Sequence, residues 1–162
     1  MSLTCEAPLP GAAFGATLRL AGTAREIVAA AERDSAALPA ALAEARGLLL
    51  LPGMGAITDD PGLLIRLSRT FGPEVEDYRH TLTDLKSVHV AVPEILLVSN
   101  MPPVSKAPPK RPEPPIAADG LIPVQYPHRK GWHTDQSYRR PPPDISLFYA
   151  VTPATRDAGQ TL

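Results

Sequence analysis

The most informative segment of the chain reads Lys130-Gly131-Trp132-His133-Thr134-Asp135-Gln136-Ser137-Tyr138. In an extended backbone, residues i and i+2 point to the same side, so the imidazole of His133 and the carboxylate of Asp135 can face one point. Two histidines and one carboxylate on one face of an iron(II) ion leave adjacent positions open for other ligands. The segment therefore predicts two of the three protein ligands of a metal site.

The length and composition exclude several classes of function. With 162 residues the chain is long enough for one domain, and its formal net charge of −1 gives no overall attraction to nucleic acid or to an anionic membrane. No segment has the character of a signal peptide or a membrane span. Cys5 is the only cysteine, so a reducing compartment is expected. These features favour a cytoplasmic protein that acts on a small organic molecule, and they are compatible with a homo-oligomer.

Helices are predicted in the N-terminal half by their start and stop residues. Thr23 and Glu26 have the spacing of a capping box. Ser35 offers a cap for a second helix, and Gly47 is a natural stop. The predicted helices cover residues 24–33, residues 36–46, and the stretch between Asp60-Pro61 and Gly72-Pro73, whose apolar face carries Leu63, Leu64, Leu67 and Phe71.

Four aliphatic or β-branched runs predict strands. The run 48–51 consists of four leucines closed by Pro52-Gly53, which is typical of a strand buried on both faces. The other predicted strands cover residues 87–92, 94–99 and 145–151. The chain has 20 prolines, nine of them between Pro102 and Pro127, so residues 102–127 are predicted to form a long surface loop. Such a loop is either a lid over the site or an insertion without a role.

The sequence around His133 resembles the metal segment of the TauD/TfdA family of iron(II)- and 2-oxoglutarate-dependent dioxygenases. That segment reads Trp-His-(Thr/Ser)-Asp with an aromatic residue shortly after, and Trp132-His133-Thr134-Asp135 with Tyr138 matches it. Further resemblances follow in the family's order: Phe14-Gly15-Ala16-Thr17-Leu18, the run from Arg46 to Gly53, the run from Leu67 to Pro73, and the run from Glu94 to Asn100.

The resemblance implies the fold and the cofactors. The expected fold is α+β and mainly β, a double-stranded β-helix of the jelly-roll or cupin-like type with flanking N-terminal helices, forming a single domain over residues 1–162. Iron(II) and 2-oxoglutarate are the implied cofactors, with His133 and Asp135 as metal ligands and a third histidine expected beyond Leu162. We expect the β-helix to be incomplete in this chain, so that the chain alone would be unstable and inactive. The chain is therefore expected to be part of a longer polypeptide.

The resemblance also assigns residues to the cosubstrate and the substrate. Ala158-Gly159-Gln160-Thr161 resembles the family's Gly-Gly-x-Thr motif, so Thr161 is expected to bind a carboxylate of 2-oxoglutarate. The implied reaction is hydroxylation of a small organic substrate by dioxygen, with release of succinate and carbon dioxide. The residues expected at the substrate pocket are Asp77, His80, Asn100 and Arg129. Asp77 and His80 replace residues that grip a sulfonate in taurine dioxygenases, so taurine itself is not implied.

Other readings of the chain stay open. His89 lies in an apolar run and is expected to be a hydrogen-bonded core residue, while His80 and His128 precede the metal motif, out of the family's order. The main alternative function is a catalytically inactive family member or fragment that acts as a binding or assembly module, in which residues 108–115 dock as an extended proline-rich ligand. A zinc hydrolase is disfavoured because the chain lacks a His-x-x-x-His pair and cysteine ligands.

Overall fold

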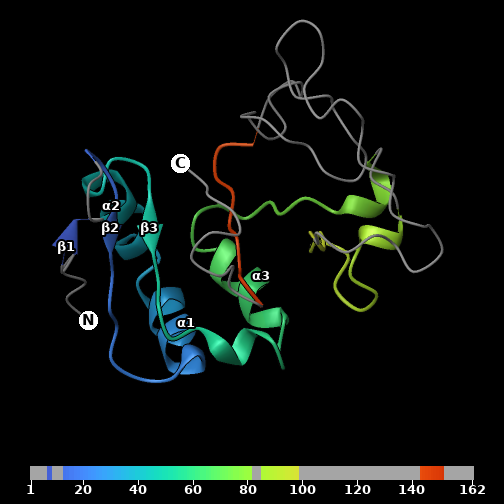
Figure 1. Ribbon diagram of the computed structural model, residues 1–162, viewed down its shortest axis with the longest axis horizontal. Helices are drawn as coiled ribbons and strands as arrows, with labels where there is room; N and C mark the ends of the chain where they lie inside the picture. The colour runs from blue at the N-terminus through green and yellow to red at the C-terminus, as the bar shows by residue number, and fades with distance from the viewer. Residues whose placement is uncertain (1–6, 9–12, 82–84, 99–142, 152–162) are drawn as a thin grey trace, which may run out of the picture. The chain divides into compact units, whose positions relative to one another are not determined.

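A computed structural model describes residues 7–8, 13–81, 85–98 and 143–151 of the chain (Figure 1). The chain divides into two compact units, one formed by Met1–Asp77 with Ile145–Leu162 and the other by Tyr78–Asp144. We refer to them as unit 1 and unit 2 and describe each by itself. The single-domain organisation stays a prediction. In the described ranges, no helix is both long and apolar enough to cross a membrane.

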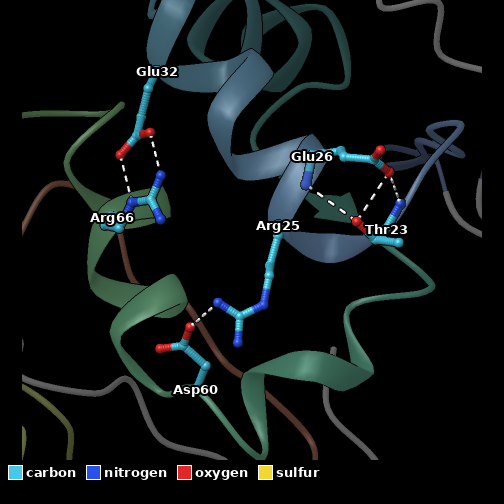
Figure 2. A network of polar contacts seen from close by, with 6 residues as sticks. All are labelled: Thr23, Arg25, Glu26, Glu32, Asp60 and Arg66. Atoms are coloured by element: carbon cyan, nitrogen blue, oxygen red, sulfur yellow. Dashed lines mark hydrogen bonds and ion pairs between the residues drawn. The ribbon is translucent and has the colours of Figure 1, made fainter.

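The first helix of unit 1, α1 (Ala24–Arg33), begins at the predicted capping box. The backbone N–H of Glu26 donates to Thr23 Oγ1 at 3.3 Å, and the backbone N–H of Thr23 donates to Glu26 Oε2 at 2.7 Å (Figure 2). These bonds satisfy amide donors that the first helical turn cannot pair by itself. The backbone N–H and the hydroxyl of Thr23 also lower the pKa of Glu26, because both stabilise its carboxylate. The predicted bounds of this helix are confirmed.

The second helix, α2 (Ala37–Glu44), follows after a tight turn in which the N–H of Ala37 donates to the carbonyl of Asp34 at 3.1 Å. Its N-cap is Ala36, without a side-chain cap, so the prediction that Ser35 caps this helix is wrong. Because the turn at Asp34 leads directly into the helix at Ala37, Ser35 lies before the N-cap and its hydroxyl does not cap the helix.

Helix α2 ends at a pair of residues with left-handed backbone. Arg46 has φ 60° and Gly47 has φ 96°. The N–H of Gly47 donates to the carbonyl of Leu42 at 2.9 Å, and that of Arg46 to the carbonyl of Ala43 at 3.0 Å. This is the bonding of a Schellman motif, which satisfies carbonyls at the end of a helix. The predicted stop at Gly47 is confirmed.

Unit 1 contains a small sheet with the order β1-β2-β3, visible as three adjacent arrows in Figure 1. Strand β1 (Ala7–Pro8) pairs antiparallel with β2 (Ala16–Thr17), and β2 pairs parallel with β3 (Leu49–Leu50) through the registers Ala16↔Leu49 and Thr17↔Leu50. Helices α1 and α2 lie between β2 and β3 along the chain, as a parallel pair requires a long connection.

The leucine run of β3 has one covered face and one open face in the described part of the chain. Leu49 and Leu51 pack against the hydrophobic core, whereas Leu48 is 40% exposed and Leu50 is 52% exposed. Alternate side chains of a strand point to opposite faces, and the helices of unit 1 cover only one of them. The prediction of a strand buried on both faces is therefore wrong for the described residues.

The core of unit 1 forms where α1, α2 and α3 (Gly62–Ser68) meet the short 3₁₀ helix η1 (Gly55–Ile57). Its most deeply buried large side chains are Leu18, Val28, Leu38 and Leu63. On α3, Leu63 and Leu67 are buried as predicted, and Ile65 is also buried. Leu64, and Phe71 beyond the end of the helix, are partly buried against the core. The helix ends at Ser68, before the predicted stop at Gly72-Pro73.

Two ion pairs join α1 to α3 and to the turn before it (Figure 2). Arg66 donates to Glu32 through Nε at 2.8 Å and through Nη2 at 2.6 Å, and Arg25 Nη1 lies 2.6 Å from Asp60 Oδ2. The hydrogen bonds from Arg66 lower the pKa of Glu32 and raise that of Arg66. Asp60 has the residue type of a helix cap, but the N-cap of α3 is Pro61, without a side-chain cap, and the Asp60 carboxylate pairs with Arg25 instead.

Unit 2 has little regular structure in its described residues. It contains the 3₁₀ helices η2 (Tyr78–His80) and η3 (Leu85–Ser87) and an isolated antiparallel bridge between Val88 and Leu96. The N–H of His89 donates to the carbonyl of Ile95 at 2.9 Å, and that of Leu97 to the carbonyl of Ser87 at 2.7 Å. The predicted runs 87–92 and 94–99 thus pair with each other, but as one bridge and not as two regular strands.

The predicted strand 145–151 is also wrong as a regular strand, because the backbone of these residues has no strand assignment in the structure. Side chains nevertheless alternate along it: Leu147 and Tyr149 pack against the core of unit 1, and Phe148 between them is 76% exposed. Within the described ranges, α-helical residues outnumber strand residues, so the mainly β composition expected from the sequence is not seen there, nor is a double-stranded β-helix.

Candidate functional site

Most residues of the predicted site lie outside the described residues. These are the metal ligands His133 and Asp135, the cosubstrate residue Thr161, the substrate residues Asn100 and Arg129, and the proline-rich loop 102–127. Their roles stay predictions. Among the residues that the structure does describe, no group of three or more His, Cys, Asp or Glu side chains is arranged to hold a metal ion.

The other two predicted substrate residues can be placed in the structure. Asp77 is half-buried and lies in unit 1, and His80 is exposed at the end of η2 in unit 2. The side chain of His80 is the more exposed of the two, whereas that of Asp77 is partly covered. Their part in substrate binding stays a prediction.

His89 is a histidine whose ring is already engaged. Its Nδ1 accepts hydrogen bonds from the backbone N–H groups of Val92 at 3.0 Å and Ala91 at 3.2 Å. An imidazole that accepts through Nδ1 carries its hydrogen on Nε2, so neither nitrogen offers a free lone pair to a metal. The prediction that His89 is hydrogen-bonded is confirmed, although the residue is half-buried and lies next to the bridge at Val88, not in a core.

The stretch that follows the predicted metal segment is attached to the core of unit 1. The described part of this stretch, residues 143–151, is drawn in orange to red in Figure 1. Leu147 and Tyr149 in it pack against the hydrophobic cluster. The hydroxyl of Tyr149 lies 2.6 Å from Thr58 Oγ1 and donates to the carbonyl of Gly55 at 3.2 Å. Tyr149 comes 14 positions after Asp135 and 12 before Thr161. One side chain therefore anchors the chain between two predicted parts of the site.

The sequence did not single out Tyr149 or Thr58. A tyrosine in an apolar run predicts only a partly buried aromatic residue, and its hydrogen-bond partner lies 91 residues away in the sequence. The alternation of Leu147, Phe148 and Tyr149 does indicate that the first and third face one way. It does not indicate which element they meet.

The predicted donor set fits an iron(II) ion by its chemistry. A neutral imidazole and a carboxylate are the ligand types of the facial triad found in non-haem iron oxygenases. The hydroxyl of Thr161 can donate a hydrogen bond to a carboxylate such as those of 2-oxoglutarate. The residue types are therefore suitable for both groups.

Comparison with known proteins gives one match. The model of the family described as "Taurine catabolism dioxygenase TauD, TfdA family" matches residues 7–162, which is almost the whole chain. No curated protein and no solved structure matches. The matched range includes Trp132-His133-Thr134-Asp135, Tyr149 and Thr161.

Proposed function

The chain belongs to the TauD/TfdA dioxygenase family, and from this we propose that it forms part of an iron(II)- and 2-oxoglutarate-dependent enzyme that hydroxylates a small organic substrate. The observation that carries the proposal is the continuous family match over residues 7–162, which includes the Trp-His-Thr-Asp segment. Bound iron(II) and 2-oxoglutarate would react with dioxygen to supply the oxidising chemistry: one oxygen atom would enter the substrate and the other succinate, with carbon dioxide released.

In this proposal the site residues of the chain bind the metal and orient the cosubstrate. His133 and Asp135 hold the metal, and a third donor completes the triad as in the rest of the family. Thr161 donates its hydroxyl hydrogen to a carboxylate of 2-oxoglutarate and so orients it. The protein contributes the geometry of the ligands and a pocket that keeps water away from the reacting groups, while the cofactors carry the demanding chemistry.

The substrate would be bound by Asp77, His80, Asn100 and Arg129. Arg129 and the adjacent Lys130 provide positive charge for an anionic group, and Asp77 provides a negative one for a cationic group. Such a pocket would suit a polar, charged organic molecule. The proline-rich loop 102–127 would serve as a lid, since it leads directly into the metal segment.

We also propose the family's double-stranded β-helix as the fold to which the helices and the small sheet of unit 1 are attached. The open face of β3, with Leu48 and Leu50, supports this proposal because an exposed apolar strand face is normally covered by further structure. The single cysteine has no partner for a disulfide within the chain, and this supports the proposal of a cytoplasmic location.

The test of this function is binding of iron(II) and 2-oxoglutarate without oxygen. In the full-length protein that carries this sequence, the two together should produce the visible charge-transfer band of an iron-bound 2-oxoglutarate chelate. His133→Ala should abolish the band because it removes a metal ligand. The matched control is His128→Ala, which removes a nearby histidine outside the motif and should leave the band unchanged. A wild-type protein without the band would refute the proposed function, and it would favour a binding module instead.

If the band forms, the substrate class can be sought by release of succinate. Anionic, cationic and neutral small molecules should be offered separately, because Arg129 and Asp77 favour opposite charges. Arg129→Gln should weaken turnover of anionic substrates selectively. Equal turnover of all three classes by the wild type and by this variant would contradict the substrate assignment.

A further inference from the structure

Unit 2 contains a loop that is closed at its base by a short antiparallel pairing. Val88 and Leu96 form the isolated bridge, and the N–H of His89 donates to the carbonyl of Ile95 at 2.9 Å. Residues 90–94 connect the two sides. We call residues 89–95 the His89 loop, because the imidazole of its first residue bonds to the backbone inside it.

The ring of His89 accepts two backbone hydrogen bonds within this loop. Its Nδ1 receives the N–H of Val92 at 3.0 Å and the N–H of Ala91 at 3.2 Å. These donors come two and three positions after the histidine, which is the pattern of a turn closed by an asparagine or aspartate side chain. Histidine Nδ1 and asparagine Oδ1 are the same number of bonds from Cβ, so the ring nitrogen takes the place of the usual oxygen acceptor.

The same loop is bonded to η2 through its backbone. The N–H of Tyr78 donates to the carbonyl of Pro93 at 3.0 Å, and the N–H of Ile95 donates to the carbonyl of Val92 at 3.0 Å. Val92 is therefore held on both sides, by the His89 ring at its N–H and by Ile95 at its carbonyl. A loop that opens at Val92 also displaces the adjacent Pro93, which is the partner of η2.

The two bonds to the ring require an unprotonated Nδ1. A neutral imidazole has one nitrogen with a lone pair, whereas both nitrogens of an imidazolium carry hydrogen and can only donate. A protonated ring would direct an N–H at the N–H groups of Ala91 and Val92. Histidine side chains in water take up this proton at about pH 6.5. Protonation of His89 and the closed loop therefore exclude each other.

Several charged or titratable residues belong to the described elements around the loop. Glu94 lies in the loop itself and Lys86 precedes it, while η2 carries Tyr78, Arg79 and His80. A charge on any of them acts on the ring only through its electric field. It does not supply the lone pair that the two amides need, so the exclusion between a protonated ring and the closed loop does not depend on these residues.

We propose that His89 is a pH-sensitive switch that keeps the His89 loop closed while its ring is neutral and opens it when the ring is protonated. The stabilising effect of the two bonds is present above about pH 6.5 and is lost as the pH falls below it, because only the neutral ring accepts them. Opening also weakens the bond between Tyr78 and Pro93. The switch needs neither iron nor 2-oxoglutarate and goes beyond the proposed function.

The test is amide hydrogen exchange of the ligand-free full-length protein at about pH 7.5 and about pH 5.5, on either side of the usual histidine titration. Protection is corrected for the intrinsic pH dependence of exchange. In the wild type, protection of residues 89–97 should fall roughly threefold to tenfold at the lower pH, the loss typical of a hydrogen bond. Helix α1 is the internal reference and should keep its protection, since the pKa values of its Glu26 and Glu32 are lowered from 4.5.

Three variants assign the effect to the ring of His89. His89→Asn provides an acceptor that does not titrate, so protection of the loop should be the same at both pH values. His89→Ala provides no acceptor, so protection should be low at both. The matched control is His80→Asn, which removes the other histidine in the described part of unit 2 and should keep the pH dependence of the wild type.

The pH dependence of loop protection, and not its absolute value, decides the outcome. A dependence that is present in the wild type and in His80→Asn, and absent from both His89 variants, supports the switch. Unchanged protection of the wild-type loop between the two pH values overturns it, as does a dependence that persists in His89→Asn or disappears in His80→Asn. An equal loss of protection in α1 also overturns it, since the whole protein would then be destabilised.

Discussion

Replacing Leu63 by alanine should be among the most destabilising single changes in unit 1. Leu63 is on α3 with none of its surface exposed, and it belongs to the cluster that also contains Leu18, Val28 and Leu38. The substitution removes three carbon atoms from the meeting point of α1, α3 and η1. Since protein interiors are closely packed, the neighbours can fill this space only in part.

The expected size of the effect follows from this burial. Fully buried Leu→Ala substitutions cost about 2–5 kcal/mol, the sum of lost transfer free energy and the residual cavity. A middle value of about 3 kcal/mol corresponds to a fall in Tm of about 6–12 °C for a protein domain of this size. Leu64 on the same helix is only half-buried. Leu64→Ala changes the same chemical groups and should cost about half as much.

The assay is urea unfolding of the full-length protein, followed by circular dichroism at several wavelengths. The free energy of unfolding should fall for both variants, with an unchanged dependence on urea concentration, because the surface exposed on unfolding stays nearly the same. The comparison between the two leucines tests the packing, since both have the same helix propensity. Equal losses for Leu63→Ala and Leu64→Ala, or a larger loss for Leu64→Ala, would refute the described orientation of α3.

Two further predictions concern the ends of the helices. Arg46 has a left-handed backbone with φ 60°, so Arg46→Gly should be more stable than Arg46→Ala by about 1 kcal/mol. Both variants lose the hydrogen bond from Arg46 Nη1 to the carbonyl of Ala13, so that this loss cancels in the comparison. Equal free energies of unfolding for the two variants would contradict the left-handed backbone. The pKa of Glu26 is lowered from 4.5 by the bonds from Thr23, so its stabilising effect is present above that pH and is lost as the pH falls through the lower folded-state value. The pKa of Glu32 is lowered from 4.5 as well, by Arg66, with the same direction of pH dependence. Glu26→Gln should therefore reduce the loss of stability between about pH 5 and about pH 3, measured by thermal unfolding, and a curve parallel to that of the wild type would contradict this link.

The local features of the helices could be predicted from the sequence because their causes lie within a few residues. The capping box needs only Thr23 and Glu26 at the right spacing, and the bounds of α1 agree with the prediction. Arg46 and Gly47 end α2 with left-handed backbone, and Gly47 adopts positive φ at little cost because it has no Cβ. The family, likewise, was identified from the short motif around His133, and the match over residues 7–162 agrees with it.

The neighbours of each side chain could not be predicted in the same way. Asp60 has the residue type of a helix cap, yet its carboxylate pairs with Arg25, which α1 brings close only in the folded unit. The four leucines of 48–51 have the pattern of a strand buried on both faces, yet the helices cover only the face that carries Leu49 and Leu51. Hydrophobicity sets which residues tend to be buried, but it does not say which surface is available to bury them.

The chain's own sequence thus determined where α1 begins, where α2 ends and which chemical groups are available for a metal and a carboxylate, since these depend on residue type and short spacing. Only the tertiary structure decided that Tyr149 meets Thr58, 91 residues earlier in the chain. The physical reason is that a hydrogen bond over such a distance forms only after the hydrophobic core has brought both segments together. The sequence specifies each hydroxyl group, and the packing of the core selects its partner.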